Sequence, residues 1–393
     1  MDAPIVVQKY GGSSVADPAR LRSVAERVAA TVRSGQRVVV VVSAMGRTTD
    51  QLIALAGQVT ERPPRRELDM LLSTGERISM ALLAMALDRL GVEAISFTGS
   101  QSGILTNDRH SGARIIEVRP IRIQDELERG KVVIVAGFQG MSYKREITTL
   151  GRGGSDTTAV ALAAALGAEY CEICSDVDGV YTADPRVVPE ARRLDCIGYE
   201  EMQELAEQGA KVIHAQAVEW AKRAGIVLYA RATTGRPDLG PVAETRIARG
   251  SEGAERRVAA VTGDHRLTRL RAPLRELPRL LGCLTAEGVA WRVARGADSS
   301  EILLSRLDLP DWSRIAERLA AHCPETTIDE LGAVTAVGSG IGSDPWLLER
   351  ALAAAGSVHG WQTSSHALTL LVATTEVDEA TRRLHAALID ERA

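Results

Sequence analysis

The residues with the clearest chemical potential lie at positions 151–158, which read Gly-Arg-Gly-Gly-Ser-Asp-Thr-Thr and precede an alanine-rich run. Ser155, Asp156 and Thr157 favour a helix start, because their side chains can accept hydrogen bonds from free backbone N–H groups. The stretch therefore predicts a glycine loop that leads into a helix N-terminus, where an anionic ligand is favoured. Arg152 adds a planar cation that suits a carboxylate or a phosphate. For this loop alone, a structural corner that binds nothing is the alternative.

A second group of polar residues, 176–186, follows the apolar segment 169–175 and contains three aspartates together with Tyr181 and Arg186. Turn chemistry at the Asp-Gly and Asp-Pro pairs explains part of this composition without any function. It does not require the tyrosine or the arginine. The group is therefore a second candidate for ligand binding.

Two further residues are candidates because of their position. Lys9 ends an apolar segment and precedes Gly11 and Gly12, in a pattern that matches neither standard glycine-rich nucleotide motif. Glu76 lies inside a predicted helix over residues 66–90. Taken alone, a surface lysine and a solvated helix acid are the simpler interpretations, because charged side chains are mostly exposed.

The five cysteines are more typical of structural residues than of a disulfide framework or a metal site. They are irregularly spaced and odd in number, at Cys171, Cys174, Cys196, Cys283 and Cys323. The first two form a C-x-x-C pair, which raises a redox or zinc role. Side chains three apart in a strand point to opposite faces, however, and no second pair lies nearby to complete a zinc site.

The elements that must position these residues alternate between strands and helices. Apolar segments at residues 5–10, 37–42, 131–140 and 169–175 predict buried strands of a mostly parallel α/β sheet. Lys9 and the group at 176–186 then lie at the C-terminal ends of strands, where ligands bind in open sheets of this kind. A glycine at position 75 inside the helix 66–90 predicts a helix restart or a close approach.

The last third of the chain has a different organisation. A polar, charged stretch at 246–257 predicts a linker. Beyond it, predicted strands at 257–262, 288–295, 299–306, 333–339 and 366–373 alternate with four helices, so that the ferredoxin-like order β-α-β-β-α-β occurs approximately twice. We expect this part to sense a ligand or to pair with another subunit.

Size and charge limit the classes of function. The chain of 393 residues is long enough for two or three domains, and its net charge of −4 gives no reason to expect a nucleic acid or an acidic membrane as partner. We find no signal-like start and no apolar run that would span a bilayer. We therefore expect a cytoplasmic protein.

Four motifs, at residues 9–14, 72–76, 151–158 and 176–186, resemble those of the aspartate kinase family in order and spacing, and the resemblance covers about residues 5–235. It implies an amino acid kinase fold at residues 1–248, followed by two ferredoxin-like ACT domains at 257–332 and 333–393. It also implies that ATP, with Mg²⁺, phosphorylates the side-chain carboxylate of L-aspartate to 4-phospho-L-aspartate. That reaction is the first step towards lysine, threonine and methionine.

The resemblance also assigns roles to residues. A carboxylate is already ionised at neutral pH, so the reaction needs positioning and charge neutralisation rather than a general base. The catalytic residues implied are Lys9, Asp156 and Lys211. Those implied to bind substrate are Ser43, Thr49, Glu76, Arg152, Gly153, Gly154 and Ser155. Those implied to bind the nucleotide are Lys9, Tyr10, Gly11, Gly12, Ser13, Asp176, Val177, Tyr181, Thr182, Ala183, Asp184, Pro185, Arg186, Lys211 and Val212. No protein ligand to a metal is predicted.

Two stretches depart from the family pattern. Residues 211–216 read Lys-Val-Ile-His-Ala-Gln where many members have Lys-Val-x-His-Pro-Arg, and residues 269–278 lack the Asp-x-Pro-Gly turn that helps to bind a lysine or threonine effector. We therefore expect weak or altered regulation, and ACT domains that serve mainly to form a homodimer or a higher homo-oligomer. The alternatives are another amino acid kinase of the same fold and a non-catalytic amino-acid sensor.

Overall fold

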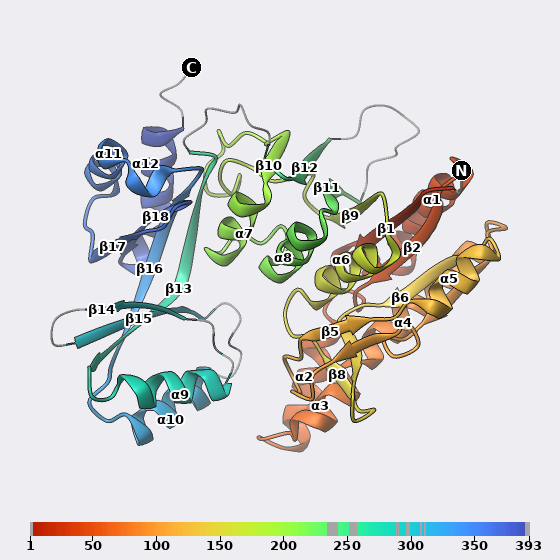
Figure 1. Cartoon of the computed structure of the whole chain (residues 1–393), viewed down its shortest axis with the longest axis horizontal. Helices are drawn as coiled ribbons and strands as arrows, with labels where there is room; N and C mark the ends of the chain where they lie inside the picture. Colours follow the sequence, from red (N-terminus) through yellow and green to blue (C-terminus); the bar gives the residue numbers. More distant parts are fainter. Residues whose placement is uncertain are drawn as a thin grey trace. The chain divides into compact units, whose positions relative to one another are not determined.

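The computed structural model describes residues 3–233, 243–250, 258–287, 289, 291–295, 299–306, 309 and 312–389 (Figure 1). The linker expected at 246–257 lies outside these residues from position 251 to 257. At residues 246–248 the prediction is wrong, because they belong to the strand Glu244–Ala248. The chain forms two compact units. The N-terminal unit comprises Met1–Val180, Arg193–Ala206 and Lys211–Glu252, and the C-terminal unit comprises Tyr181–Arg192, Glu207–Ala210 and Gly253–Ala393. The division into one kinase domain and two ACT domains at the expected boundaries stays a prediction.

An eight-stranded sheet organises the N-terminal unit, in the order β10-β12-β11-β9-β1-β2-β6-β3. Six strands are mutually parallel: β3 (Ala94–Phe97), β6 (Val132–Ala136), β2 (Arg37–Val42), β1 (Ile5–Tyr10), β9 (Tyr170–Ser175) and β11 (Val227–Ala232). At one edge, β12 (Glu244–Ala248) runs antiparallel to β11 and parallel to β10 (Cys196–Gly198). The predicted mostly parallel α/β sheet is confirmed.

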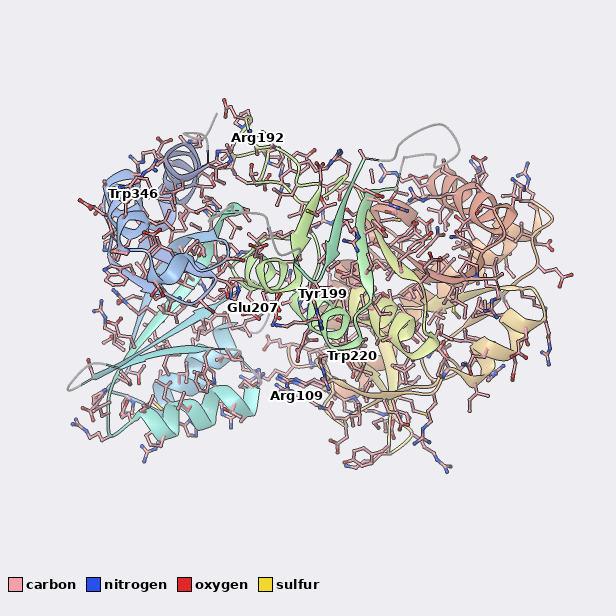
Figure 2. All side chains as sticks on the ribbon, turned by 45° about the horizontal axis from the view of Figure 1, so that its top comes forward. Arg109, Arg192, Tyr199, Glu207, Trp220 and Trp346 are labelled. Atoms are coloured by element: carbon pink, nitrogen blue, oxygen red, sulfur yellow. The ribbon has the colours of Figure 1, made fainter. Side chains whose placement is uncertain are left out.

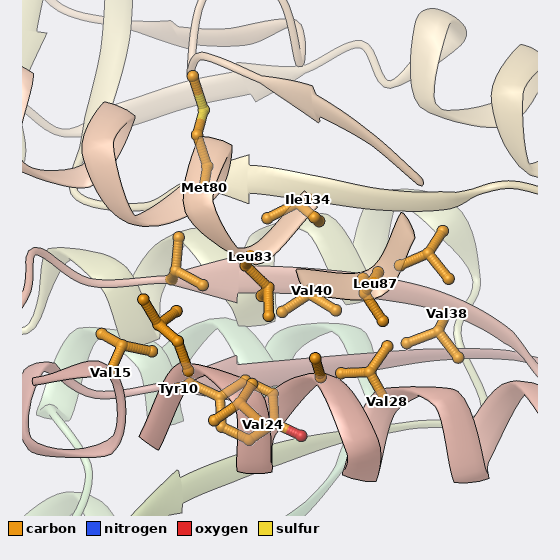
Figure 3. Packing of buried hydrophobic residues seen from close by; sticks show 14 of the residues in the cluster. Tyr10, Val15, Val24, Val28, Val38, Val40, Met80, Leu83, Leu87 and Ile134 are labelled. Atoms are coloured by element: carbon orange, nitrogen blue, oxygen red, sulfur yellow. The ribbon is translucent and has the colours of Figure 1, made fainter. Parts of the chain in front are cut away.

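Helices cover both faces of this sheet. On one face, α1 (Pro18–Arg33) and α4 (Thr74–Asp88) pack their apolar sides against β1, β2 and β6, as Figure 3 shows for Val28, Leu83 and Val40. On the other face, α6 (Gly154–Leu166) lies against β1 and β9 and packs on α8 (Ala215–Ala224). Because alternate strand residues face opposite sides, Lys9 points to the α6 face, while its neighbours on the strand point to the α1 face.

The start of α1 follows from its sequence. Asp17 lies at the N-cap and accepts hydrogen bonds from the backbone N–H groups of Ala19 and Arg20, each over 2.9 Å, and Pro18 occupies the first helical position. Further helices of this unit are α2 (Thr48–Val59), α5 (Ile121–Glu128) and α7 (Tyr199–Glu207). In Figure 2, Tyr199 marks the start of α7 and Trp220 lies on α8.

The long helix expected at 66–90 is two helices, as the mid-helix glycine indicated. Helix α3 (Arg65–Leu72) ends before Ser73, and α4 begins at Thr74. A Cβ atom added to Gly75 would lie 2.8 Å from Cβ of Ala44, so the glycine is required by a close approach. By length and composition, Arg65–Asp88 is the one helical stretch of the described residues that could cross a membrane. The break at Ser73 and the packing of α4 in the core are typical of core helices instead.

The N-terminal unit also contains a small second sheet that the sequence patterns did not predict. Its order is β5-β4-β7-β8, with β5 at Ile115–Val118, β4 at Ile104–Thr106, β7 at Gln139–Ser142 and β8 at Ile147–Thr149. Its strands contain only three or four residues, which is too short for a clear alternation of apolar and polar side chains. This sheet leads directly into the glycine-rich loop at 151–154.

The C-terminal unit is built on one antiparallel sheet in the order β14-β15-β13-β16-β18-β17. The strands are β13 (Ala260–Pro273), β14 (Arg292–Arg295), β15 (Ser299–Ser305), β16 (Thr327–Val337), β17 (Gly360–Thr363) and β18 (Ala367–Val372), and the helices are α9 (Leu277–Glu287), α10 (Trp312–His322), α11 (Pro345–Ala355) and α12 (Val377–Leu388). The first β-α-β-β-α-β repeat runs from β13 to β16. The second begins in β16 and takes its last strand from the start of β13, which pairs with Thr335 and its neighbours. Two ferredoxin-like modules are thus confirmed, joined by two shared strands.

The C-x-x-C pair is buried and unbridged. Cys171 and Cys174 are both free thiols in the interior of β9. Burial raises the pKa of Cys174 to about 12, so its thiolate form is strongly disfavoured. No group of three metal-ligating side chains occurs among the described residues. These observations agree with a structural role.

Candidate active site

An ion pair joins the first and third motifs. Lys9 projects from β1 towards α6, and its Nζ lies 2.7 Å from Oδ1 of Asp156. Each side chain is 11% exposed, so the pair is mostly withdrawn from water. Asp156 lies in the first turn of α6, where the helix dipole stabilises a negative charge. The structure therefore holds a cation at the sheet edge predicted to bind ligands.

The turn after β1 has room for a Cβ atom at position 11 but leaves room only for glycine at position 12. A Cβ atom added to Gly11 would lie 3.4 Å from Nζ of Lys9, and one added to Gly12 would lie 2.9 Å from the carbonyl oxygen of Ala44. The backbone N–H of Gly11 donates to the carbonyl of Cys174 over 3.3 Å, so this predicted donor to a phosphate is already used within the protein. Ser13, in the same turn, is exposed.

Tyr10 contributes only its main chain to this edge. Its side chain is fully buried on the α1 face, opposite to Lys9, and its hydroxyl donates to Oε1 of Gln8 over 3.2 Å. Its carbonyl accepts from the N–H of Ser43 over 3.0 Å. The nucleotide contact that the resemblance implied for Tyr10 therefore stays a prediction for its main chain alone, because strand alternation turns the side chain away.

Glu76 occupies a second part of the edge, in the first turn of α4. Its Oε1 accepts a hydrogen bond from the N–H of Ala44 over 3.1 Å, next to Ser43. Its Oε2 is buried and has no hydrogen-bond partner among the described residues. Burial raises the pKa of the Glu76 carboxyl to about 7, although the Ala44 N–H favours the charged form. A buried oxygen of this kind suits a cationic ligand group. Thr49 lies nearby in sequence, in the first turn of α2.

The glycine-rich loop is shaped by backbone conformation rather than by side-chain caps. The N-cap of α6 is Gly153, with φ +62°, and no side chain caps the helix. The expectation that Ser155, Asp156 or Thr157 would cap it is therefore wrong. A Cβ atom added to Gly153 would lie 2.2 Å from Cβ of His214, so the His214 side chain packs on the loop.

Ser155 and Arg152 complete this loop in different ways. Ser155 is buried, and a Cβ atom added to Gly137 would lie 2.9 Å from its hydroxyl oxygen. Gly154 is also buried, whereas Arg152 is exposed at the tip of the loop. The loop thus places an exposed arginine beside a buried helix N-terminus.

The stretch at 211–216 contains a contact that the sequence analysis missed. The backbone N–H of His214 donates to Oδ2 of Asp156 over 3.3 Å, so the carboxylate that holds Lys9 is also tied to the start of α8. Because the donor is a backbone N–H, no residue type in the sequence signals this contact. Lys211, three positions before His214, is exposed, and Val212, two positions before it, is half-buried.

The predicted nucleotide loop is divided between the two units. Asp176 and Val177 are exposed after β9 in the N-terminal unit, whereas residues 181–186 belong to the C-terminal unit. There, Thr182 is buried and its hydroxyl oxygen lies 2.9 Å from Nε2 of His385. Asp184, Pro185 and Arg186 are exposed, and the Arg186 guanidinium pairs with the Asp184 carboxylate over 2.7 Å. Tyr181 is half-buried and Ala183 is buried.

Comparisons with known proteins show the family of this chain. Residues 4–229 match the model of the amino acid kinase family. The aspartokinase of Mycolicibacterium smegmatis is 43% identical over 98% of this chain and 96% of its own length. The structure of Escherichia coli aspartokinase III in complex with aspartate and ADP (R-state) is similar, with a TM-score of 0.85 and 26% identity over 98% of this chain and 99% of that one. The complex of that enzyme with lysine and aspartate (T-state) has a TM-score of 0.73 at 27% identity, with the same shares of the two chains covered. The chain therefore belongs to the amino acid kinase family, and within it to the aspartokinases.

Proposed function

We propose that this chain transfers the γ-phosphoryl group of ATP to the side-chain carboxylate of L-aspartate, forming 4-phospho-L-aspartate as the first step towards lysine, threonine and methionine. The main support is the cation of Lys9, held 2.7 Å from Asp156 beside a glycine turn at the sheet edge. The E. coli relative binds aspartate and ADP.

Two groups on this unit suit the two ends of an α-amino acid. Oε2 of Glu76 is a buried acceptor that the substrate ammonium would satisfy. Arg152 would bind the α-carboxylate through its guanidinium. Ser43, Thr49, Gly153, Gly154 and Ser155 would then surround the substrate. This placement leaves the side-chain carboxylate as the group that faces the phosphate.

The transfer itself needs charge neutralisation more than proton transfer. An oxygen of the aspartate side chain attacks the γ-phosphorus, and the bond from that phosphorus to the β–γ bridging oxygen breaks, releasing ADP. The attacking carboxylate has an ordinary pKa of about 4, so it is already ionised. Lys9 would neutralise the phosphoryl oxygens, while Asp156 holds it in place before the nucleotide binds. Lys211 would act on the same phosphates.

The remaining nucleotide contacts follow from the resemblance. Gly12 and Ser13 would lie against the phosphates, and the set Asp176, Val177, Tyr181, Thr182, Ala183, Asp184, Pro185, Arg186 and Val212 would hold the ribose and the base. Mg²⁺ bound to the phosphate oxygens would supply further positive charge. The described residues contain no cluster of three metal-ligating side chains, which suits a magnesium ion held mainly by phosphates and water.

Regulation and assembly are proposed from the C-terminal unit. The E. coli relative has a complex with lysine, but here the turn between β13 and α9 contains no glycine. We infer that lysine and threonine inhibit weakly or not at all, and that the ACT pair mainly joins subunits in a cytoplasmic homo-oligomer. Full inhibition at low concentrations of lysine and threonine, alone or together, would refute the regulatory part. Light scattering would measure the assembly, and cell fractionation the location.

The activity itself can be tested with a panel of acceptors. Purified protein would be incubated with ATP, Mg²⁺ and L-aspartate, L-glutamate, N-acetyl-L-glutamate or uridine monophosphate. Release of ADP would report turnover with any acceptor, and trapping with hydroxylamine would show whether the product is an acyl phosphate. We expect product with L-aspartate and loss of turnover in Lys9→Ala. Lys222→Ala is the matched control, because Lys222 forms an exposed pair with Glu200 over 3.1 Å. Turnover with another acceptor, or none with any, would contradict the proposal.

A further inference from the structure

Asp69, on α3, is a fully buried carboxylate for which the proposed chemistry has no role. Oδ1 accepts a hydrogen bond from the hydroxyl of Thr149 over 2.6 Å, and Oδ2 lies 2.8 Å from Nδ1 of His110. The backbone N–H groups of Ser111 and Thr149 add hydrogen bonds of 3.1 and 3.2 Å. An ionised carboxylate only accepts, so all of these groups donate to it. Asp69 thus joins three separate segments of the chain.

The number of hydrogen bonds to its carboxylate distinguishes Asp69 from a residue that only fills space in the core. Burying a carboxylate away from water is costly unless hydrogen bonds compensate for the lost solvation. Here the donors come from residues 41, 42 and 80 positions away along the chain. An apolar residue could fill the same volume, but it would not order these donors. The arrangement therefore fixes the positions of the segments relative to α3.

The segment that contains Thr149 leads straight into the glycine-rich loop. Thr149 is the last residue of β8, and Arg152 follows in the loop. The carbonyl of Thr149 accepts hydrogen bonds from the N–H groups of Gly112 and Ala113 over 3.1 and 2.9 Å. The segment at 110–113 is therefore attached to the base of the loop by Asp69 on one side and by Thr149 on the other.

The segment that contains Asp69 leads into the helix of Glu76. Helix α3 ends before Ser73, and α4 begins at Thr74. The carbonyl of Ser73 accepts a hydrogen bond of 2.9 Å from the side chain of Gln139. Gln139 lies on β7, where it is the strand partner of Thr149 on β8. Two buried braces, from Asp69 and from Gln139, therefore connect the start of α4 to the base of the glycine-rich loop.

The brace also holds a costly backbone conformation. Ser111 has φ +59°, a left-handed conformation that is unfavourable for residues other than glycine. Its N–H donates to both oxygens of Asp69, over 3.1 and 3.2 Å. Strain of this kind persists only where neighbouring contacts determine the conformation.

We propose that Asp69 is a positioning residue for the acceptor amino acid, which sets the spacing between Glu76 and Arg152. The inference rests on the proposed function, in which these two residues bind the α-ammonium and the α-carboxylate. The two anchors and the γ-phosphate together make three points of attachment for the amino acid. The L- and D-isomers can meet three such points only from opposite sides, so anchors held at a set spacing favour one isomer over the other. Asp69 therefore contributes to the choice of stereoisomer without touching the substrate.

The test uses variants of the full-length protein that remove one hydrogen bond at a time. Asp69→Asn replaces an acceptor by an amide that can accept at only one atom, and Thr149→Val removes the 2.6 Å hydroxyl donor. Thr149→Ser keeps that donor and is the matched control. We expect kcat/KM for L-aspartate to fall on the order of 10- to 100-fold in Asp69→Asn and Thr149→Val, mainly through KM. The KM for ATP should stay within about twofold, and the preference for L- over D-aspartate should fall.

The outcomes separate this inference from the proposed function. If Glu76→Gln and Arg152→Ala raise the KM for L-aspartate while Asp69→Asn and Thr149→Val do not, the positioning role is wrong and the proposed function stands. If Glu76→Gln and Arg152→Ala leave that KM unchanged, the assigned anchors are wrong and the inference falls with them. Should Asp69→Asn fail to fold, the comparison of Thr149→Val with Thr149→Ser decides. A loss of kcat and melting temperature without any change in KM or stereoisomer preference would also overturn the proposal.

Discussion

The N–H of Ala44 holds one oxygen of Glu76 over 3.1 Å, while the other oxygen is buried without a hydrogen-bond partner among the described residues. The loop after β2 and the first turn of α4 thus form an incomplete site for a cation. The carboxyl pKa is raised to about 7 by burial, so its charge changes within the range of an ordinary assay.

The first prediction concerns substrate affinity and pH. Below about pH 7, Glu76 in the free enzyme becomes protonated and loses its attraction for an ammonium group. We expect the KM for L-aspartate to rise as the pH falls from 8 to 6, because only the ionised form binds the substrate cation. In Glu76→Gln the KM should be high and nearly independent of pH over this range. Initial rates at several aspartate concentrations would measure both, and a pH-independent KM in the parent enzyme would contradict the assignment.

The raised pKa of Glu76 also means that its ionised form destabilises the folded protein. Its pKa in the folded state lies above the ordinary value of 4.5, so the folded protein binds this proton more tightly than the unfolded chain. The bound proton contributes its full stabilisation of the folded state below pH 4.5, and this contribution is lost as the pH rises through about 7. We expect Glu76→Gln to have a higher melting temperature than the parent at pH 8, with the difference vanishing near pH 4.5. Calorimetry at the two pH values would measure it.

A second relationship concerns the pair of Lys9 and Asp156. Removing one partner of a buried pair leaves the other charge uncompensated and typically costs about 3–5 kcal/mol, and the slight exposure of this pair places it at the lower end. We expect Asp156→Asn to lower the melting temperature and to reduce kcat by a factor on the order of 100. Added ADP should stabilise Asp156→Asn more than the parent, because its phosphates restore a counter-charge for Lys9. Equal stabilisation of both proteins by ADP would argue against a Lys9–phosphate contact.

The two ends of α6 provide a matched test of the His214 contact. Gly153 and Gly167 have nearly the same left-handed backbone, with φ of +62° and +61°. An added Cβ atom meets His214 at 2.2 Å in the first case and nothing within 4 Å in the second. Gly167→Ala should cost about 1 kcal/mol in the free energy of unfolding, and Gly153→Ala clearly more, with loss of activity. Chemical denaturation would measure both, and equal costs would show that the contact with His214 is unimportant.

Thiol reactivity tests the structural interpretation of the C-x-x-C pair. Cys196 is exposed, whereas Cys171 and Cys174 are buried, and burial raises the pKa of both of the latter. We expect an alkylating reagent at pH 8 to label Cys196 in the native protein within minutes and the other two only after unfolding. Mass spectrometry of peptides would locate the label. Rapid native labelling of Cys171 or Cys174 would revive a redox role.

Local patterns predicted much of the framework. The valine run at 38–42 indicated a buried strand, which is confirmed, and the start of α1 follows from Asp17 at its N-cap and Pro18 at its first position. The small sheet was missed because its strands are too short for a periodic signal. A strand was predicted at 257–262, but the structure has one long strand, β13, which reaches from Ala260 to Pro273 and serves both ferredoxin-like modules.

The sequence by itself determined the α/β class, the places where strands give way to glycine turns, and the four motifs that identify the family, because these depend on residue types at short spacing. Only the tertiary structure decided which side chains meet. His214 reaches Asp156 from 58 positions away, and Thr149 reaches Asp69 from 80. Contacts at such separations depend on the order of strands and on which face of the sheet each residue takes, and neither leaves a local pattern in the chain.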